Sequence, residues 1–234
     1  MNVAHLVPSF ARIACQLLIA LWSLSALGQD VADKPDLRLW DEWIFVETGS
    51  DEGKPVNRRW RRQIVEILGD DKVRVARING VDVYDRSWNL RHPERPNFWA
   101  VDFQFPLRVG AEWSFASPVG YFDTRGQTYD QRGHHKVVAM ETISVGAGTF
   151  KCFRIEGESS WISGSVYSAD AKHVERWIMT RWYCPDVRYI AKLHIERTIL
   201  NTYDRGLYSE LNSELVDFRP GKPVVLTPET SAPK

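Results

Sequence analysis

Short runs in which apolar and polar residues alternate dominate the chain between about residues 37 and 218. Within residues 98–105, every second position from Trp99 onward is a large apolar residue: Trp99, Val101, Phe103 and Phe105. Residues 187–195 repeat the pattern. Successive side chains of a β-strand point to opposite faces, so this period of two predicts strands with one buried face. No long segment has helical periodicity, and the sequence predicts an all-β, antiparallel fold as a barrel, half-barrel or sandwich.

Two hairpins are predicted from β-rich runs on either side of a short turn that contains glycine. The first spans residues 64–78 with its turn at 69–71, and the second spans residues 136–155 with its turn at 146–148. Polar residues 201–213, which include a glycine, are expected to form a loop or a short helix.

The two hairpins lie within a longer similarity between two halves of the chain. Residues 42–45 and 112–115 both read Glu-Trp-x-Phe, and residues 77–80 and 154–157 both read Arg-Ile-x-Gly. The offset between the halves changes from 70 to 77 positions, which predicts an insertion in the second half. We interpret the similarity as a diverged internal duplication, and a chance alignment of common β features is the alternative. The predicted halves are residues 37–105 and 106–218.

The N-terminus has the pattern of an export signal. Residues 1–12 carry one charge, at Arg12, and an apolar segment follows. Small residues stand at Ala26 and Gly28, with one bulky residue between them, which is the spacing that signal peptidase recognises. We therefore expect residues 1–28 to be a cleaved signal peptide, and an uncleaved anchor helix is the alternative.

Cys15 does not have the context of a lipidated cysteine. Lipid attachment requires an apolar segment before the cysteine and an aliphatic residue three positions upstream, whereas Arg12 stands there and the apolar segment comes afterwards. The protein is therefore predicted to be periplasmic or secreted and not a lipoprotein. No later run of 18 apolar residues occurs, so no transmembrane helix is predicted in the mature chain.

Residues 29–218 are predicted to form a single antiparallel β domain. Residues 219–234 hold four prolines and few large apolar residues, so we expect a disordered tail. Two cysteines remain after the signal, Cys152 and Cys184. An exported compartment is oxidising, so an even pair favours a disulfide bond, with two buried thiols as the alternative.

A set of short motifs resembles a group of uncharacterised exported proteins of Gram-negative bacteria. The motifs, within residues 105–218, are Phe105-Pro106-Leu107-Arg108-Val109-Gly110-Ala111-Glu112-Trp113, Ala147-Gly148-Thr149-Phe150, Arg154-Ile155, Trp182-Tyr183-Cys184-Pro185 and Glu214-Leu215. The resemblance implies an exported β protein. That group has no established activity, so no catalytic residue can be transferred from it. Its members often have a small or polar residue at the position of Cys184, which implies that the disulfide is specific to this chain.

Histidines are the first candidates for a metal site, and their pattern is unfavourable. His134 and His135 are adjacent, so on a strand they point to opposite faces and cannot readily share one ion. His173 and His194 have no cysteine or carboxylate at ligand spacing. We expect solvated or strand-surface histidines, no metal site and no cofactor.

Candidate nucleophiles and acids are also weak. Residues 157–161 read Gly-Glu-Ser-Ser-Trp, which lacks the second glycine and the helix of a nucleophile elbow. The carboxylate pairs at residues 51–52 and 70–71 lie in polar stretches typical of solvated turns. We therefore predict no catalytic residue and no enzymatic activity.

The strongest local charge feature is a basic cluster on a predicted strand. It consists of Arg58, Arg59, Trp60, Arg61 and Arg62. Four guanidinium groups around one indole suit a phosphate or carboxylate ligand, such as a lipid head group in a cell envelope. The alternative is a solvated strand whose arginines pair with neighbours such as Asp51 and Glu52. The whole chain has 30 basic and 30 acidic residues, and this balance argues against a nucleic-acid partner.

Arg77 and Arg154 occupy matching positions in the two predicted halves. By alternation each shares a face with a small apolar residue, Val75 or Cys152. Burying an arginine is costly unless a carboxylate pairs with it. We expect both arginines to be paired for structural reasons, and a role in anchoring a ligand is the alternative.

Three functional hypotheses follow. The first is a non-enzymatic binding or assembly module of the cell envelope. The second is a carrier that holds a lipid-like or apolar ligand in a β-barrel mouth, where the basic cluster would bind the head group. The third, an envelope hydrolase, has the least support. Either an envelope component or a lipid-like ligand is the expected partner.

Overall fold

The computed structural model describes residues 30–69, 71–91, 101–116, 121–122, 127–165, 168–200 and 205–221. The described part of the chain contains thirteen strands, one short 3-10 turn and no α-helix. The elements are β1 (Val31–Ala32), β2 (Glu42–Asp51), β3 (Lys54–Leu68), β4 (Lys72–Arg77), β5 (Gly80–Asp85), β6 (Leu107–Arg108), β7 (Glu112–Ala116), β8 (Tyr121–Phe122), β9 (Gln127–Val145), β10 (Gly148–Ser165), β11 (Ser168–Cys184), η1 (Pro185–Val187), β12 (Tyr189–Leu200) and β13 (Arg205–Arg219).

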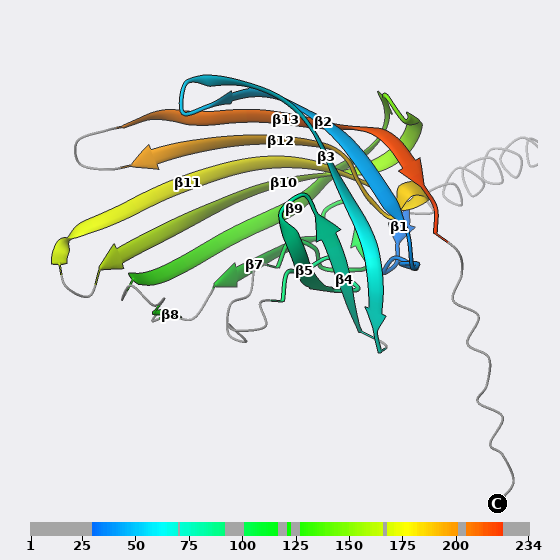
Figure 1. Ribbon diagram of the computed structural model, residues 1–234, viewed down its shortest axis with the longest axis horizontal. Coiled ribbons are helices and arrows are strands. Elements are labelled where there is room, and N and C mark those ends of the chain that lie inside the picture. The colour runs from blue at the N-terminus through cyan, green and yellow to red at the C-terminus, as the bar shows by residue number, and fades with distance from the viewer. Residues whose placement is uncertain are drawn as a thin grey trace, which may run out of the picture. The chain divides into compact units, whose positions relative to one another are not determined.

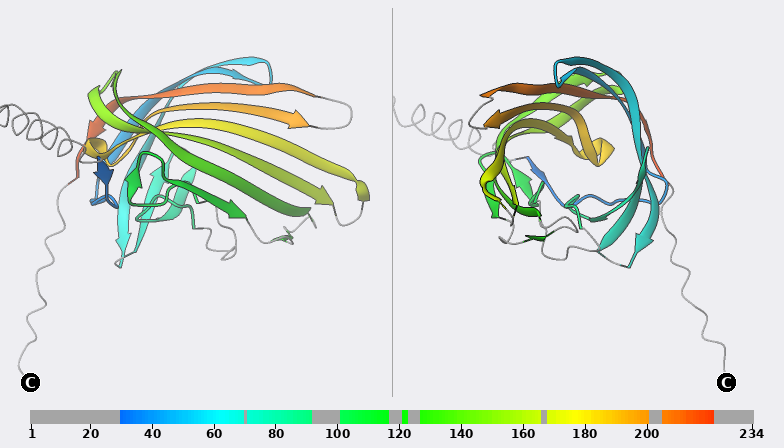
Figure 2. Two further views of the ribbon diagram at one scale, coloured as in Figure 1. Left: turned by 180° about the vertical axis from the view of Figure 1, so that it is seen from behind. Right: turned by 60° about the vertical axis from the view of Figure 1, so that its left-hand side comes forward.

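One large antiparallel sheet contains eleven of the strands (Figure 1). Ten strands lie side by side in the order β5-β4-β3-β2-β13-β12-β11-β10-β9-β7, and β8 also pairs with β9. The strands β5 and β7 are the two ends of this order, so the sheet is open and not a closed barrel. The prediction of an all-β, antiparallel fold is confirmed, and the curled sheet of Figure 2 corresponds to the half-barrel among the three alternatives.

The order of the strands follows from two meanders. In the first, β2 to β5 pair in sequence order, and in the second, β9 to β13 do the same. The last strand, β13, then pairs with β2 and joins the two meanders. Both predicted hairpins are present, as β3–β4 and β9–β10. Each Glu-Trp strand pairs with the first strand of a hairpin, β2 with β3 and β7 with β9, but the duplication itself stays a prediction.

The sheet bends where three irregularities in strand pairing line up across it. The extra residues are Val138 of β9, opposite Arg154 and Ile155, Ala191 of β12, opposite Trp182 and Tyr183, and Val216 of β13. Across the sheet, Arg154 pairs with Trp182, Trp182 pairs with Lys192, and Lys192 pairs with Glu214. The three irregularities therefore lie close to one another on neighbouring strands. A β-bulge bends its strand and increases the local twist. The aligned bulges therefore explain why strands of up to 19 residues curl into a concave face.

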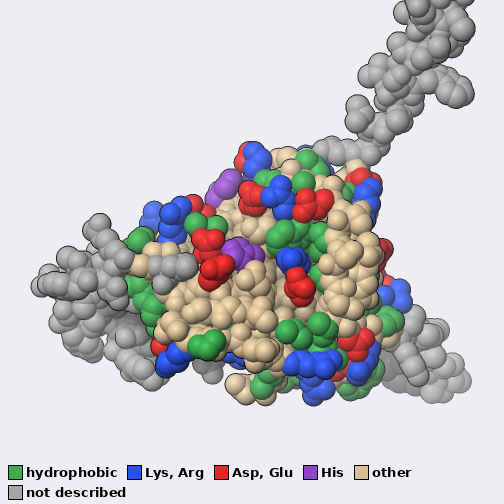
Figure 3. All heavy atoms as spheres, turned by 90° about the horizontal axis from the view of Figure 1, so that it is seen from above, with side chains coloured by type: hydrophobic (Ala, Val, Ile, Leu, Met, Phe, Trp, Pro, Cys, Tyr) green, Lys and Arg blue, Asp and Glu red, His purple; other side chains and the backbone are tan. Residues whose placement is uncertain are grey.

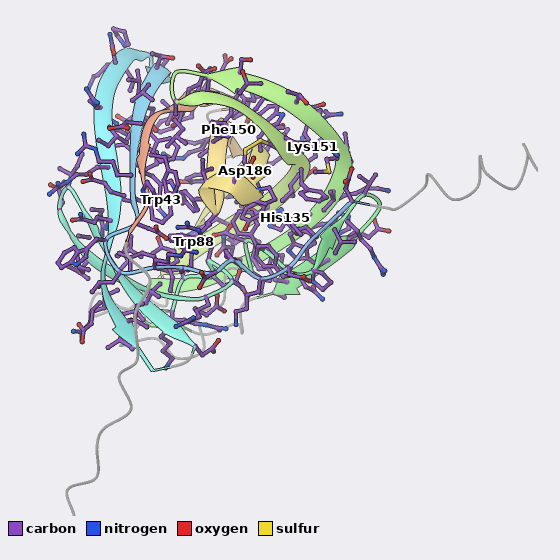
Figure 4. All side chains as sticks on the ribbon, turned by 90° about the vertical axis from the view of Figure 1, so that its right-hand side faces the viewer. Trp43, Trp88, His135, Phe150, Lys151 and Asp186 are labelled. Atoms are coloured by element: carbon purple, nitrogen blue, oxygen red, sulfur yellow. A yellow bond between two sulfur atoms is a disulfide. The ribbon has the colours of Figure 1, made fainter. Side chains whose placement is uncertain are left out.

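Large aromatic side chains fill one end of the concave face. Trp43 of β2 and Trp88, which follows β5, are both fully buried and meet edge to face with ring centroids 5.2 Å apart. Their indole N–H groups donate to the backbone carbonyls of Val187 (2.7 Å) and Arg188 (2.8 Å). A buried indole needs such an acceptor. The two tryptophans therefore fix η1 inside the curl, where Figure 4 shows them beside it.

The predicted disulfide is confirmed. Cys152 of β10 and Cys184 of β11 are bonded, with their Cα atoms 4.2 Å apart, next to the paired residues Phe153 and Tyr183. Both cysteines are fully buried. The bond therefore joins neighbouring strands directly before the chain turns into η1.

Some sequence predictions are wrong, and others concern residues outside the described ranges. The expected loop or helix at residues 201–213 is wrong from residue 205 onward, because β13 begins there and pairs with β12 and β2. The predicted signal peptide and most of the predicted tail, residues 222–234, lie outside the described ranges. A helix with the length and apolarity to cross a membrane was not found in the part of the chain that is described.

Candidate functional site

Two neighbouring cavities lie along the inner side of the curled sheet. The larger, about 370 Å³, is bordered by β3, by the turn between β4 and β5, and by β12. The smaller, about 190 Å³, is bordered by the segment after β5, by residues 102–103 and by β11 and β12. Four residues line both cavities: Arg62, Tyr189, Ile190 and Leu193. We treat the two cavities together as the candidate site.

The strand period divides the predicted basic cluster between two faces. Arg58, Trp60 and Arg62 share a face with Ile64, which is fully buried, and all three line the larger cavity. Arg59 is exposed and belongs to the opposite face. Arg61 borders the larger cavity, but its guanidinium group pairs with Glu42 on the outer face (3.3 Å). The five residues therefore do not form one binding surface.

The expected partners of these arginines differ from the observed ones. Arg58 pairs with Glu47 (2.5 Å), and Glu42 also receives Arg219 (3.0 Å). Asp51 and Glu52, expected as partners, instead accept hydrogen bonds from Ser209 and Tyr208. In the view of Figure 3, basic and acidic side chains lie next to one another in small groups, as such pairs require.

Arg62 lies among aromatic rings at the junction of the two cavities. Its Nη1 donates to the hydroxyl of Tyr189 (2.6 Å). Its guanidinium carbon lies 5.4 to 5.7 Å from the ring centroids of Trp60, Tyr84 and Tyr189, within the range of cation–π attraction. Among the described carboxylates, none forms an ion pair with Arg62; the two nearest in its electrostatic environment, Asp102 and Asp82, pair with other arginines.

The charges at this junction follow from burial. Burial lowers the pKa of Arg62, but Tyr189, Tyr84 and the two aspartates raise it, and the net shift is upward. Burial also raises the pKa of Tyr84 and that of Tyr189, so both phenols stay neutral at physiological pH. The junction therefore holds one permanent positive charge beside neutral rings.

The other arginines at the cavities are neutralised by carboxylates. Arg181 is largely buried and donates to Asp102 (2.8 Å) at the smaller cavity. Arg77 lines the larger cavity and pairs with Asp82 (2.9 Å). Arg154, predicted to occupy the position equivalent to Arg77, does not line either cavity. It lies on the face of β10 opposite to the buried one and pairs with Glu156 (2.6 Å) and Glu141 (3.6 Å). Only Arg77 of this predicted pair therefore reaches the candidate site.

His135 corrects one sequence expectation. It and His134 do point to opposite faces, but His135 is fully buried, not solvated. Its ring packs against Trp113 and Phe115, with centroids 5.4 and 5.6 Å away, and its Nδ1 lies 3.5 Å from Nη1 of Arg181. Burial and the charge of Arg181 lower the pKa of His135 to about 3. The imidazole is therefore neutral and belongs to the core (Figure 4).

Of the candidates whose side chains are described, His134, His194 and the serine segment do not line the cavities. His134 contacts Glu112 (3.5 Å), and His194 contacts Asn212 (2.8 Å) on the outer face; the side chain of His173 is not described. Residues 157–161 lie within the continuous strand β10, with Ser159 buried, so they do not form a tight turn. In the described ranges, no group of three or more histidines, cysteines or carboxylates could hold a metal ion.

Sequence reasoning missed the residues that complete the site. Alternation assigned Tyr189 and Leu193 to one face and did not single out Ile190, but all three line the cavities, because the pairing shifts between β11 and β12 at this point. Arg181 and Asp102 are 79 positions apart, and nothing in their local sequence relates them. The arginine in the alternating strand β11 was the available signal, since it shares a face with the buried Tyr183.

Comparisons with known proteins give a limited result. No protein-family model matches the chain, and no curated protein matches it. Among solved structures, a "putative lipoprotein" from Parabacteroides distasonis is 13% identical with a TM-score of 0.43, over 82% of this chain and 100% of that one. A "putative exported protein with YmcC-like fold" from Bacteroides fragilis is 12% identical with a TM-score of 0.39, over 80% and 99%. The resemblance to uncharacterised exported proteins, inferred from motifs, stays a prediction.

Proposed function

We propose that the protein is an exported, non-enzymatic binding protein that holds a ligand in the two cavities of its concave face. The observation that carries this proposal is that the described side chains on the inner side of the sheet leave two cavities beside one another. The larger cavity, about 370 Å³, falls within the range of about 300–1,000 Å³ typical of small-molecule sites. Its neighbour shares four lining residues with it, so one ligand can contact both.

The composition of the lining supports binding over catalysis. In the smaller cavity apolar and aromatic side chains surround a few charged groups, which is the usual composition of a ligand pocket, and the lining of the larger cavity is more polar. Among the described residues that line the cavities there is no serine, threonine, cysteine or histidine. The described lining therefore lacks a serine, cysteine or histidine for hydrolysis, and its two carboxylates, Glu47 and Asp102, pair with Arg58 and Arg181.

Export is supported by two independent features. The N-terminal sequence has the order of a signal peptide, with a small-x-small site before residue 29. The buried disulfide between Cys152 and Cys184 suits an oxidising compartment, because cytosolic thiols are kept reduced.

Native mass spectrometry of the protein recovered from the periplasm of its own host tests the proposal. We expect the mature chain to begin at residue 29 and to carry a bound molecule that is released on activation. The substitution Leu193→Trp should remove this molecule, because Leu193 lines both cavities. Ile178→Trp is the matched control, because Ile178 lies on the outer face of β11 and is already 37% exposed.

Two results would contradict the proposal. One is wild-type protein that carries no ligand and binds none of the amphiphilic probes described below. The other is equal ligand occupancy in the Leu193→Trp and Ile178→Trp variants, both of which must first show the circular dichroism of the folded wild type. Protein without ligand that assembles into a defined larger complex would favour the assembly hypothesis instead.

A further inference from the structure

We propose that the ligand is a singly charged anionic amphiphile, whose head group binds Arg62 and whose alkyl part lies in the smaller cavity. A fatty-acid carboxylate is the simplest member of this class. The inference rests on the proposed binding function and adds to it the chemical class of the ligand and the residue that selects it.

The first argument is the incomplete hydrogen bonding of Arg62. A guanidinium group offers five N–H donors, and the described residues supply one acceptor, the hydroxyl of Tyr189. Removing a guanidinium from water is costly unless an anion compensates it. Because Arg62 lines both cavities, an anion that enters either one can reach its free donors. The planar fork of arginine also matches the two oxygens of a carboxylate.

The second argument is the charge balance of the lining, which favours a single negative charge. Arg181 pairs with Asp102, and Arg77 pairs with Asp82. Arg58 and Glu47 form a further pair in the larger cavity. Pairing these groups leaves only Arg62 without a counter-charge in the described lining. A head group with two charges would leave one uncompensated close to the aspartates, whereas a single charge completes the balance.

The third argument is the apolar wall beside the charge. In the smaller cavity the apolar lining includes Leu90, Phe103, Met179, Ile190, Leu193 and Ile195. Arg62 also lines it, together with the rings of Tyr84 and Tyr189 that its guanidinium group contacts. A ligand that contacts all of these groups must join a charged end directly to a hydrocarbon part. Free phosphate or sulfate would leave the apolar wall uncovered, and a neutral lipid would leave Arg62 unpaired.

Calorimetric titration of the oxidised, mature protein with dodecanoate, dodecanol and dodecyl phosphate tests the inference. We expect wild-type protein to bind dodecanoate most tightly. The substitution Arg62→Gln should weaken dodecanoate binding by about 10- to 100-fold, the effect of losing charge-assisted hydrogen bonds, and should leave dodecanol binding unchanged. Arg74→Gln is the matched control, because Arg74 lies on the outer face of β4 in an exposed pair with Glu66.

The outcomes separate this inference from the proposed function. If wild-type protein binds none of the three probes, both ideas are wrong. If it binds dodecanol as tightly as dodecanoate, prefers the phosphate, or keeps its preference in the Arg62→Gln variant, only the ligand class is wrong. Should Arg62→Gln fail to fold, Arg62→Lys retains the charge without the planar fork and should lose most of the carboxylate preference.

Discussion

Protonation of His135 should destabilise the protein in mild acid. The imidazole is fully buried between two aromatic rings, and its Nδ1 lies 3.5 Å from the permanently charged guanidinium of Arg181. Burial and this like charge both oppose a second positive charge, and they lower the pKa of His135 to about 3. In the unfolded chain the pKa of the same group is about 6.5.

The sign of the effect follows from proton binding in the two states. Between about pH 6.5 and pH 3 the unfolded chain binds a proton at His135 that the folded chain does not, so the free energy of unfolding falls as the pH falls. Above about pH 6.5 neither state is protonated and the effect vanishes. With these two pKa values, the linkage relation gives a loss of about 2 kcal/mol at pH 5 relative to pH 7.5.

Urea unfolding of wild type and His135→Gln at both pH values measures this loss. The variant itself is less stable, but its change in unfolding free energy between the two pH values should be smaller by about 2 kcal/mol. His194→Gln serves as the control of opposite sign. Burial lowers the pKa of His194, but hydrogen bonds to Asn212 and Glu196 raise it overall, so protonation stabilises the fold there. Parallel pH dependence of wild type and His135→Gln would refute the account of a buried neutral imidazole.

Three further substitutions probe the fold. Replacing both Cys152 and Cys184 with serine should lower the free energy of unfolding by about 3–4 kcal/mol, the loop-entropy value for a separation of 32 residues; an unchanged denaturation midpoint would contradict it. Gly157→Ala should cost about 1–3 kcal/mol, because its Cβ would overlap the buried imidazole opposite, whereas Gly206→Ala has open space and should be close to neutral in the same thermal melt. Asp41→Ala should cost about 3–5 kcal/mol in chemical denaturation, because this fully buried carboxylate accepts hydrogen bonds from a guanidinium and two backbone amides; a loss below about 1 kcal/mol would contradict it.

Alternation predicted most of the strands because each one has a single buried face. The strand predicted at residues 98–105 is wrong in its described part, because residues 101–105 belong to no strand. The same period, uninterrupted in this part of β3, places Arg58, Trp60 and Arg62 on one face, a division that the prediction of a single basic cluster over residues 58–62 did not make. The same reasoning failed at β12, where a shift in pairing brings Tyr189 and Ile190 to the same cavities. A bulge depends on how neighbouring strands fit together, and a single strand's sequence does not show it.

The polar start of β13 shows a second limit. Ser209 and Ser213 lack the apolar character of a strand, so the sequence indicated a loop. In the structure both are buried and bind carboxylates of β2, Asp51 and Glu47. Their partners lie more than 150 positions away in the sequence, and hydrogen bonding across the sheet compensates for the missing apolar contacts. Such pairs become visible only when the strand order is known.

The basic cluster on β3 illustrates that residues adjacent in the sequence can lie on opposite faces of a sheet and so belong to different surfaces. A solvated strip of four arginines would attract anions of any shape through an electrostatic field that salt screens. The structure instead places Arg59 and Arg61 on the outer face, pairs Arg58 with Glu47, and leaves Arg62 among aromatic rings beside an apolar wall. A partly buried guanidinium is screened less, and the proposed ligand is an anion whose remainder fits the cavity. The selectivity that we propose therefore depends on the curl of the sheet, because Arg62 lines the cavities on its inner side.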